Sequence, residues 1–190
     1  MQLMEEKILK EGTVLPGNIL KVGSFLNQQL DVKFLHELAK EFAKLFANDQ
    51  ITRIVTIEAS GIALATLTAL ELGVPCVIVK KHASANLPKD VYTAEIASFT
   101  HNNVYTAVVA KDYIPAGERV LIVDDFLAVG NAIAGLRSLL DQAGASLVGC
   151  AIAVEKSFQG GGDALRAEGI HVESLAMVDA MTDTDITFRR

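Results

Sequence analysis

Apolar and polar positions alternate between two periods along most of the chain. Asp31 to Asn48 carries apolar side chains at helical spacing, and Asp31 is suited to cap its first turn. Ile51 to Glu58 is rich in β-branched residues and apolar enough for a buried strand. Gly61 to Gly73 predicts a helix that ends at a glycine, and Val74 to Lys81 predicts a second strand.

The middle of the chain interrupts this order. Val91 to Ser98 and Asn103 to Ala110 flank Thr100-His101-Asn102, which predicts a β-hairpin or a flap. The alternation then resumes through a strand, a helix, a strand, a short helix and a strand, over Arg119 to Asp125, Asn131 to Gly144, Ser146 to Lys156, Asp163 to Gly169 and Ile170 to Val178. Gly160-Gly161-Gly162 is interpreted as a flexible turn. The pattern predicts an α/β fold with a mostly parallel sheet covered on both faces, and ligands at the carboxyl ends of its strands.

Composition narrows the class of protein. With 190 residues, 51% of them hydrophobic and 21% charged, the chain can bury a large core, and it shows no linker or repeat. We therefore expect one domain over residues 1–190. The net charge of −6 argues against a nucleic-acid partner. Its apolar stretches are too short for a membrane helix of ~20 residues, and early charges interrupt any signal sequence, so we expect a cytoplasmic protein.

The most informative stretch is VLIVDDFLAVGNAI, from Val120 to Ile133. An apolar strand delivers Asp124 and Asp125, and a loop of small residues then leads into a helix. Such a loop can present successive backbone N–H groups to a phosphate. Carboxylates beside it can accept hydrogen bonds from sugar hydroxyls or neutralise a cation. A phosphorylated sugar satisfies both halves; the alternative is an acidic strand end followed by an ordinary capped turn.

The same stretch resembles the phosphoribosyl pyrophosphate (PRPP) signature of type I phosphoribosyltransferases. Five further segments resemble the bacterial members that act on xanthine: VLPGNILKVGSFLNQQLD, ITRIVTIEASGIALA, VIVKKH, VYTAEIASFTHN and AVEKSFQGGG. The resemblance covers nearly the whole chain. It implies the type I phosphoribosyltransferase fold, in which the sheet and its helices carry a small hood and a flexible β-hairpin. The hood is expected from residues 1–30 together with the C-terminal segment.

The resemblance also implies roles for single residues in binding PRPP. Asp124 and Asp125 are the implied catalytic pair. The implied loop for the 5-phosphate consists of Ala128, Val129, Gly130, Asn131 and Ala132. The implied pyrophosphate contacts are Ser60, Gly61 and Lys81, the last reaching across a dimer interface. Many relatives carry threonines where this chain has Ala128 and Asn131, so more of the phosphate binding is expected to fall to backbone N–H groups.

For the purine base, the resemblance points to Leu20, Asn27, Lys156 and Phe126. An aromatic face stabilises a flat heterocycle, and Asn and Lys side chains donate to exocyclic oxygens, of which xanthine has two. Core packing is the competing explanation for Leu20 and Phe126, and it is the favoured one for Phe158.

The activity that follows is the conversion of xanthine and PRPP to xanthosine 5′-monophosphate and pyrophosphate in purine salvage, with Mg²⁺ on the pyrophosphate and a homodimeric enzyme. No protein metal site is expected at His82, His101 or His171. An adenine or hypoxanthine-guanine phosphoribosyltransferase would share the PRPP half. A PRPP-sensing regulator of transcription is the alternative from another class, but it needs a DNA-binding domain and a basic surface.

Overall fold

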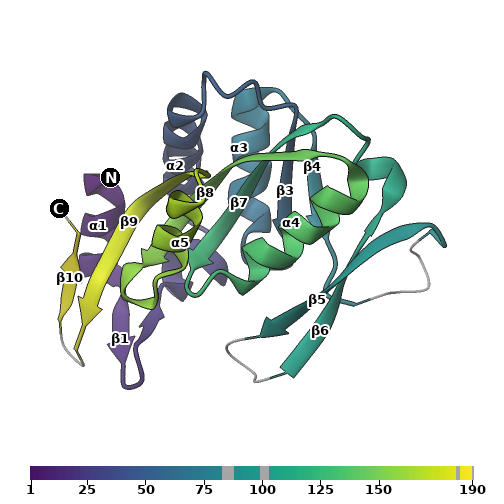
Figure 1. The fold of residues 1–190 in the computed structure, drawn as a ribbon. Helices are drawn as coiled ribbons and strands as arrows, with labels where there is room; N and C mark the ends of the chain where they lie inside the picture. The colour runs from purple at the N-terminus through teal and green to yellow at the C-terminus, as the bar shows by residue number, and fades with distance from the viewer. Residues whose placement is uncertain (83–87, 99–102, 183–184, 190) are drawn as a thin grey trace.

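A central sheet organises the computed structural model, which describes residues 1–82, 88–98, 103–182 and 185–189. Within these residues six strands lie in the order β10-β9-β8-β7-β3-β4 (Figure 1). Every neighbouring pair from β4 to β9 is parallel, whereas β10 (Ile186–Phe188) runs antiparallel to β9 (His171–Met181). The predicted mostly parallel sheet is confirmed, and the antiparallel edge strand is an addition to it.

The strands at the centre of the sheet explain its longest apolar runs. They are β7 (Arg119–Leu127), flanked by β8 (Ser146–Lys156) and β3 (Arg53–Ile57), with β4 (Cys76–Val79) at the second edge. Residues 120–123 of β7 are fully buried because helices cover both faces. A strand buried on both faces cannot alternate polar and apolar residues, so it is continuously apolar until the site begins.

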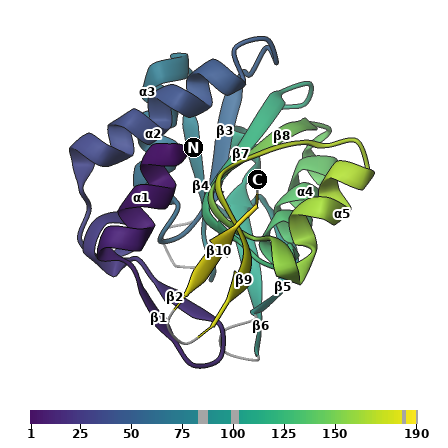
Figure 2. The same cartoon turned by 90° about the vertical axis from the view of Figure 1, so that its left-hand side faces the viewer.

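Helices form a layer on each side of the sheet (Figure 2). One layer holds α1 (Gln2–Glu11), α2 (Val32–Leu45) and α3 (Ile62–Leu72), and the other holds α4 (Asn131–Ala143) and α5 (Gly161–Ala167). As predicted, the Asp31 carboxylate caps α2, accepting the Phe34 N–H at 3.2 Å. None of the helices in the described ranges is long and apolar enough to cross a membrane.

The sequence pattern did not predict several short elements near the N-terminus. They are α1, the antiparallel pair β1 (Thr13–Leu15) and β2 (Ile19–Lys21), and a π-helix at Gly23–Asn27. Only Met4 and Ile8 of α1 are buried, so its apolar stripe is too thin to stand out. Short 3₁₀ helices at Lys111–Tyr113 and Ser157–Gln159 complete the elements.

The predicted hairpin is present as β5 (Val91–Ser98) and β6 (Asn103–Ala110), which pair along their whole length. Its tip, Thr100-His101-Asn102, lies outside the described residues. The hairpin packs on α4 at Gly135, where an added Cβ would lie only 2.3 Å from Ile96 Cγ1. Because Ile96 is buried in that contact, the helix that follows the acidic strand also supports the hairpin.

The glycine run is not a flexible turn, and that interpretation is wrong. Gly161 and Gly162 form the first turn of α5 and are buried, so the helix begins earlier than the predicted Asp163. Gly160 precedes them with φ +79°, a left-handed conformation that glycine adopts at little cost. Glycine is normally a poor helix former, and for this reason the sequence pattern predicted the start of α5 two residues too late.

The buried stripe of α2 provides a test of the core. Phe42 is fully buried, and Phe42→Ala removes its ring from a packed cluster, so we expect a loss of about 3–5 kcal/mol in unfolding free energy. Val32→Ala on the same helix, at a side chain 59% exposed, should change it by less than about 0.5 kcal/mol. Urea denaturation measures both, and similar losses would contradict the packing described.

Candidate active site

The two acids of the motif lie at the carboxyl end of β7, where both are almost buried. Asp124 is 7% and Asp125 8% exposed. The Asp125 N–H donates to Asp124 Oδ1 at 2.9 Å, and Asn27 Nδ2 donates to Asp125 Oδ2 at 3.0 Å. Asn27 comes from the π-helix near the N-terminus. The structure therefore brings a residue expected at the base into contact with one of the expected catalytic acids.

Burial controls the ionisation of the first acid. It raises the pKa of Asp124 well above the ordinary value, and the charge of Asp125 adds to the rise, while Lys81 opposes it. Two carboxylates side by side away from water favour positive charge in their surroundings. The pair is thus suited to a ligand that is cationic or becomes so.

The turn between β3 and α3 packs directly against Asp124. A Cβ at Gly61 would lie 2.8 Å from Asp124 Oδ1 and 2.4 Å from Thr56 Oγ1, so only glycine fits there. The predicted Ser60-Gly61 segment therefore adjoins the acids. Among the described residues no side chain caps α3 or α4, unlike α2 with its Asp31. Within the described ranges α1 and α5 also lack a side-chain cap, and the Ile62 N–H of α3 donates to the Ala59 carbonyl. What sets α3 and α4 apart is that both begin at the carboxyl edge of the sheet near the acids, where the first N–H groups of a helix suit an anion.

The predicted phosphate loop lines a pocket between β7, α4 and the hairpin. Its lining consists of Lys81, Ile96, Ala97, Tyr105, Phe126, Leu127, Ala128, Val129, Gly130, Asn131, Ala132 and Ile133. The volume of the pocket is about 180 Å³, which is below the ~300 Å³ of a typical small-molecule site. Gly130 has φ +95°, the left-handed conformation that turns the chain into α4.

One residue of the loop has its side-chain donor engaged elsewhere. Asn131 Nδ2 donates to the Ala97 carbonyl of β5 at 3.1 Å, which ties the start of α4 to the hairpin. The side chain that stands in place of a threonine therefore contacts protein backbone here. Nothing in the local sequence indicates this contact, because the two residues lie on separate elements.

Two lysines follow β4, and only one of them lines the pocket. Glu58 accepts the Lys81 N–H at 2.7 Å and the Lys80 ammonium at 3.2 Å. Burial pushes the pKa of Glu58 upward, but these donors outweigh it and hold the pKa below the ordinary value. The Lys81 ammonium lies 5.4 Å from the centre of the Tyr105 ring. Burial, with a further contribution from the Asp124 charge, raises the pKa of Tyr105.

Lys156, Phe126 and Leu20, which are expected at the base, lie near the segment that contains β1 and β2. Lys156 Nζ donates to the Asn18 carbonyl at 2.9 Å and lies 5.7 Å from the centre of the Phe126 ring. Burial lowers the pKa of Lys156. Leu20 is 6% exposed and belongs to the core cluster against which Phe126 packs. The prediction that Phe158 packs in the core is wrong, because this residue is 38% exposed.

Sequence reasoning missed Tyr105, Asn18 and the carboxylate of Glu58. Tyr105 lies in β6, whose sequence is that of an ordinary alternating strand. The packing of the hairpin on α4 brings it to the pocket. Asn18 has φ +59°, and its position next to a glycine is a turn signal, but it does not reveal that Lys156 reaches its carbonyl.

The raised pKa of Asp124 makes a prediction about stability. An acid whose folded pKa is raised costs stability once pH exceeds its unfolded pKa, because ionising it is less favourable in the native state than in the unfolded chain. Asp124→Asn removes this cost and keeps the oxygen that accepts the Asp125 N–H. Its Tm should exceed that of the unaltered protein at about pH 8, and the difference should shrink toward about pH 4.

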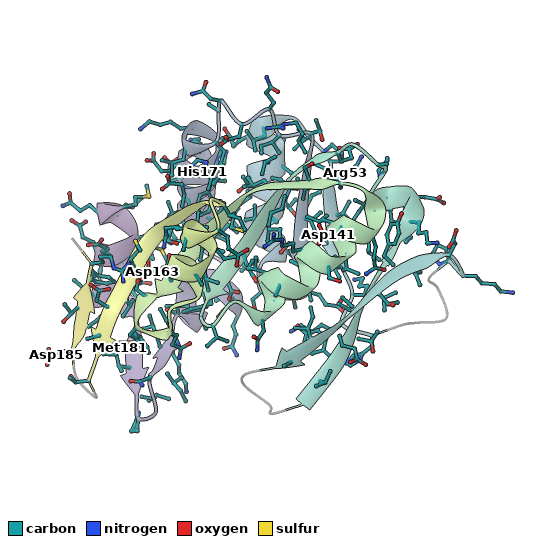
Figure 3. All side chains as sticks on the ribbon, viewed as in Figure 1. Arg53, Asp141, Asp163, His171, Met181 and Asp185 are labelled. Carbon is teal, nitrogen blue, oxygen red and sulfur yellow. The ribbon has the colours of Figure 1, made fainter. Side chains whose placement is uncertain are left out.

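Asp163→Asn provides the matched control. This exposed carboxyl on α5 (labelled in Figure 3) is paired with Arg189, whose hydrogen bond holds the pKa of Asp163 below its ordinary value. Its stabilising contribution is present at neutral pH and is lost as pH falls, so Asp163→Asn should lower Tm at about pH 8. Equal Tm changes for the two variants would contradict the assignment for Asp124.

Comparison with known proteins agrees with this geometry. The chain is 48% identical over 187 residues to a xanthine phosphoribosyltransferase from Lachnoclostridium phytofermentans, covering 98% of this chain and 96% of that protein. It is 49% identical over 188 residues to one from Bacillus cytotoxicus, covering 99% and 95%.

Solved structures share the fold. The adenine phosphoribosyltransferase of Rhodothermus marinus superposes with a TM-score of 0.75 at 23% identity, covering 93% of this chain and 99% of that one. The Saccharomyces cerevisiae enzyme, complexed with an imino-altritol bisphosphate and adenine, gives 0.73 at 26% identity, covering 92% and 99%. Finally, residues 22–163, which include both acids and the loop, match the family model of the phosphoribosyl transferase domain. The chain therefore belongs to the phosphoribosyltransferase family.

Proposed function

We propose that this phosphoribosyltransferase converts xanthine and PRPP to xanthosine 5′-monophosphate and pyrophosphate, as a purine salvage enzyme of the cytoplasm. The relatives that are 48–49% identical over nearly the whole chain carry the name xanthine phosphoribosyltransferase. The observation in the structure that most supports the proposal is that two buried acids stand near the end of β7, directly before the loop that lines the pocket and leads into α4, a helix without a side-chain cap.

The arrangement suits the three parts of PRPP. The loop from Ala128 to Ala132 offers backbone N–H groups to the 5-phosphate. Asp124 and Asp125 are placed to accept hydrogen bonds from the ribose hydroxyls. The start of α3 at Ser60 and Gly61, together with the Lys81 ammonium in the pocket, offers donors and positive charge to the pyrophosphate.

Mg²⁺ fits this donor set as a companion of the substrate. In the described residues no three His, Cys, Asp or Glu side chains gather into a metal site. Mg²⁺ prefers oxygen ligands and is commonly held by one or two carboxylates together with substrate phosphates. Asp124 and Asp125 are the carboxylates that would share it, and bound Mg²⁺ would neutralise charge on the departing pyrophosphate.

The reaction exchanges one bond at the sugar C1 for another. The bond from C1 to the pyrophosphate oxygen breaks, a bond to a purine ring nitrogen forms, and that nitrogen releases its proton to water. C1 carries positive charge in between, and buried carboxylates beside the ribose stabilise it more effectively than they would in water. No covalent nucleophile takes part. Holding base and sugar in line supplies most of the remaining rate.

Recognition of the base rests on Phe126, Lys156 and Asn27. The ammonium has three donors and uses one on the Asn18 carbonyl, so it can also donate to an exocyclic oxygen of xanthine. Asn27 uses one N–H on Asp125 and keeps a second N–H and an oxygen for the ring. Leu20 belongs to the buried cluster against which Phe126 packs.

A panel of bases tests the proposed substrate. Xanthine, hypoxanthine, guanine, adenine and uracil are each supplied with Mg²⁺ and PRPP while nucleotide formation is followed. Adenine presents an amino group, a hydrogen-bond donor, where the Lys156 ammonium needs a carbonyl acceptor. We therefore expect the kcat/KM for adenine to be lower than that for xanthine by about 10³-fold or more. Equal use of adenine and xanthine would refute the proposal in favour of an adenine phosphoribosyltransferase.

Lys156→Ala tests the residue that carries this specificity. Losing a charged hydrogen bond to a xanthine oxygen should raise the KM for xanthine about 10-fold or more and leave the KM for PRPP nearly unchanged. Lys44→Ala, at a side chain 77% exposed, is the control and should change neither. A rise only in the KM for PRPP would contradict this role and would assign Lys156 to the PRPP half of the site.

We also propose a homodimer, as the resemblance to type I phosphoribosyltransferases implies; Lys81 lines the pocket of its own chain, so the proposal does not rest on its reaching a neighbouring subunit. Sedimentation at micromolar concentration should give twice the monomer mass. A fully active monomer would overturn this proposal without affecting the substrate.

A further inference from the structure

The first turn of α5 packs against the loop that we propose for the 5-phosphate. The Gly161 N–H donates to the Ala128 carbonyl at 3.1 Å. A Cβ added at Gly161 would lie 2.3 Å from that oxygen, 2.7 Å from the Val129 carbonyl carbon and 2.9 Å from the Gly130 nitrogen. All three are backbone atoms of the loop, so any larger residue must displace the loop itself.

The other side of the same turn is fixed by an ion pair whose carboxylate is fully buried. A Cβ at Gly162 would lie 2.1 Å from Glu155 Oε1, and Glu155 is fully buried. Arg166 of α5 donates to both oxygens of this carboxylate, at 2.9 and 2.7 Å, and the Ser174 hydroxyl donates to it as well. A bidentate pair of this kind fixes orientation as well as distance.

We infer that Gly161, Gly162 and the Glu155–Arg166 pair are positioning residues for the phosphate loop. The inference rests on the proposed function, because it assigns PRPP to that loop. A carbonyl oxygen carries partial negative charge and would repel a phosphate if it turned toward the ligand. The Gly161 N–H holds the Ala128 carbonyl on α5, and the ion pair holds α5 in place. The N–H groups of the loop are then left to face the anion.

A purely structural role would give a different result from this one. If α5 only anchored the fold, its variants would lower stability and would affect PRPP and xanthine alike. A positioning role changes PRPP binding selectively, since the loop touches the sugar phosphate and the base lies beyond Phe126. Glu155 is unsuitable for substitution because it directly precedes Lys156, which serves the base.

The test measures binding of PRPP with Mg²⁺ by calorimetry in Gly161→Ala and Arg166→Lys. In Gly161→Ala the displaced loop should weaken PRPP binding about 10-fold or more, with the KM for xanthine at saturating PRPP changed less than about 2-fold. Lysine keeps the charge but loses the bidentate geometry, so Arg166→Lys should weaken PRPP binding about 3-fold. Ala167→Gly, at an exposed position of α5, is the control and should leave PRPP affinity unchanged.

Urea denaturation accompanies each variant, and Arg166→Lys decides the matter if Gly161→Ala does not fold. Unchanged PRPP affinity in a folded Gly161→Ala protein, or equal losses for PRPP and xanthine, would overturn the inference while the proposed function stands. Absence of PRPP binding by the unaltered protein would overturn the proposed function and the inference with it. If the unaltered protein binds PRPP but does not use xanthine, the calorimetric comparison of PRPP binding among the variants still tests the inference.

Discussion

Backbone N–H groups without side-chain partners at the starts of α3 and α4 are the constraint on which the site depends. An N–H group kept from both water and a partner costs about 1–3 kcal/mol, so helices normally begin at a cap, as α2 does at Asp31. Among the described residues α3 and α4 begin at Gly61 and Gly130 without one, and α1 and α5 also lack a side-chain cap. The starts of α3 and α4 differ in lying at the carboxyl edge of the sheet, and in the proposed function the anionic ligand supplies acceptors there.

The acids beside these helix starts show that the site is built at some expense of stability. Asp124 is buried against Gly61 and its neighbour Asp125, in surroundings that raise its pKa. A carboxyl placed for folding alone would have a cation or several donors, as Glu155 has with Arg166 and Ser174. Local destabilisation of this kind is typical of a functional site, where the ligand or the transition state supplies the missing partner.

The parts predicted from sequence are those in which neighbours in the chain decide the outcome. Helix and strand periods located α2 through β9, and the acids and loop were recognisable because one strand, one turn and one helix start contain them all. Long-range contacts could not be predicted in this way. Met4 and Ile8 of α1 are buried only because distant segments cover them. The need for glycine at the start of α5 is visible only in the structure, where the backbone of the loop packs against Gly161. Role assignments depended on resemblance, since no local pattern shows that Asn27 reaches Asp125.

The phosphate loop is supported from two directions, and this bears on its lack of threonines. On one side the Ala128 carbonyl accepts the Gly161 N–H, and on the other Asn131 donates to the Ala97 carbonyl of the hairpin. Hydroxyl side chains in such a loop can both contact the phosphate and steady the turn. Here contacts from α5 and β5 steady the turn, and in the proposed function the phosphate is left to backbone N–H groups. Helix α4 carries the loop at its start and contacts the hairpin at Gly135. The loop and the hairpin therefore share one support beside the pocket proposed for the sugar phosphate.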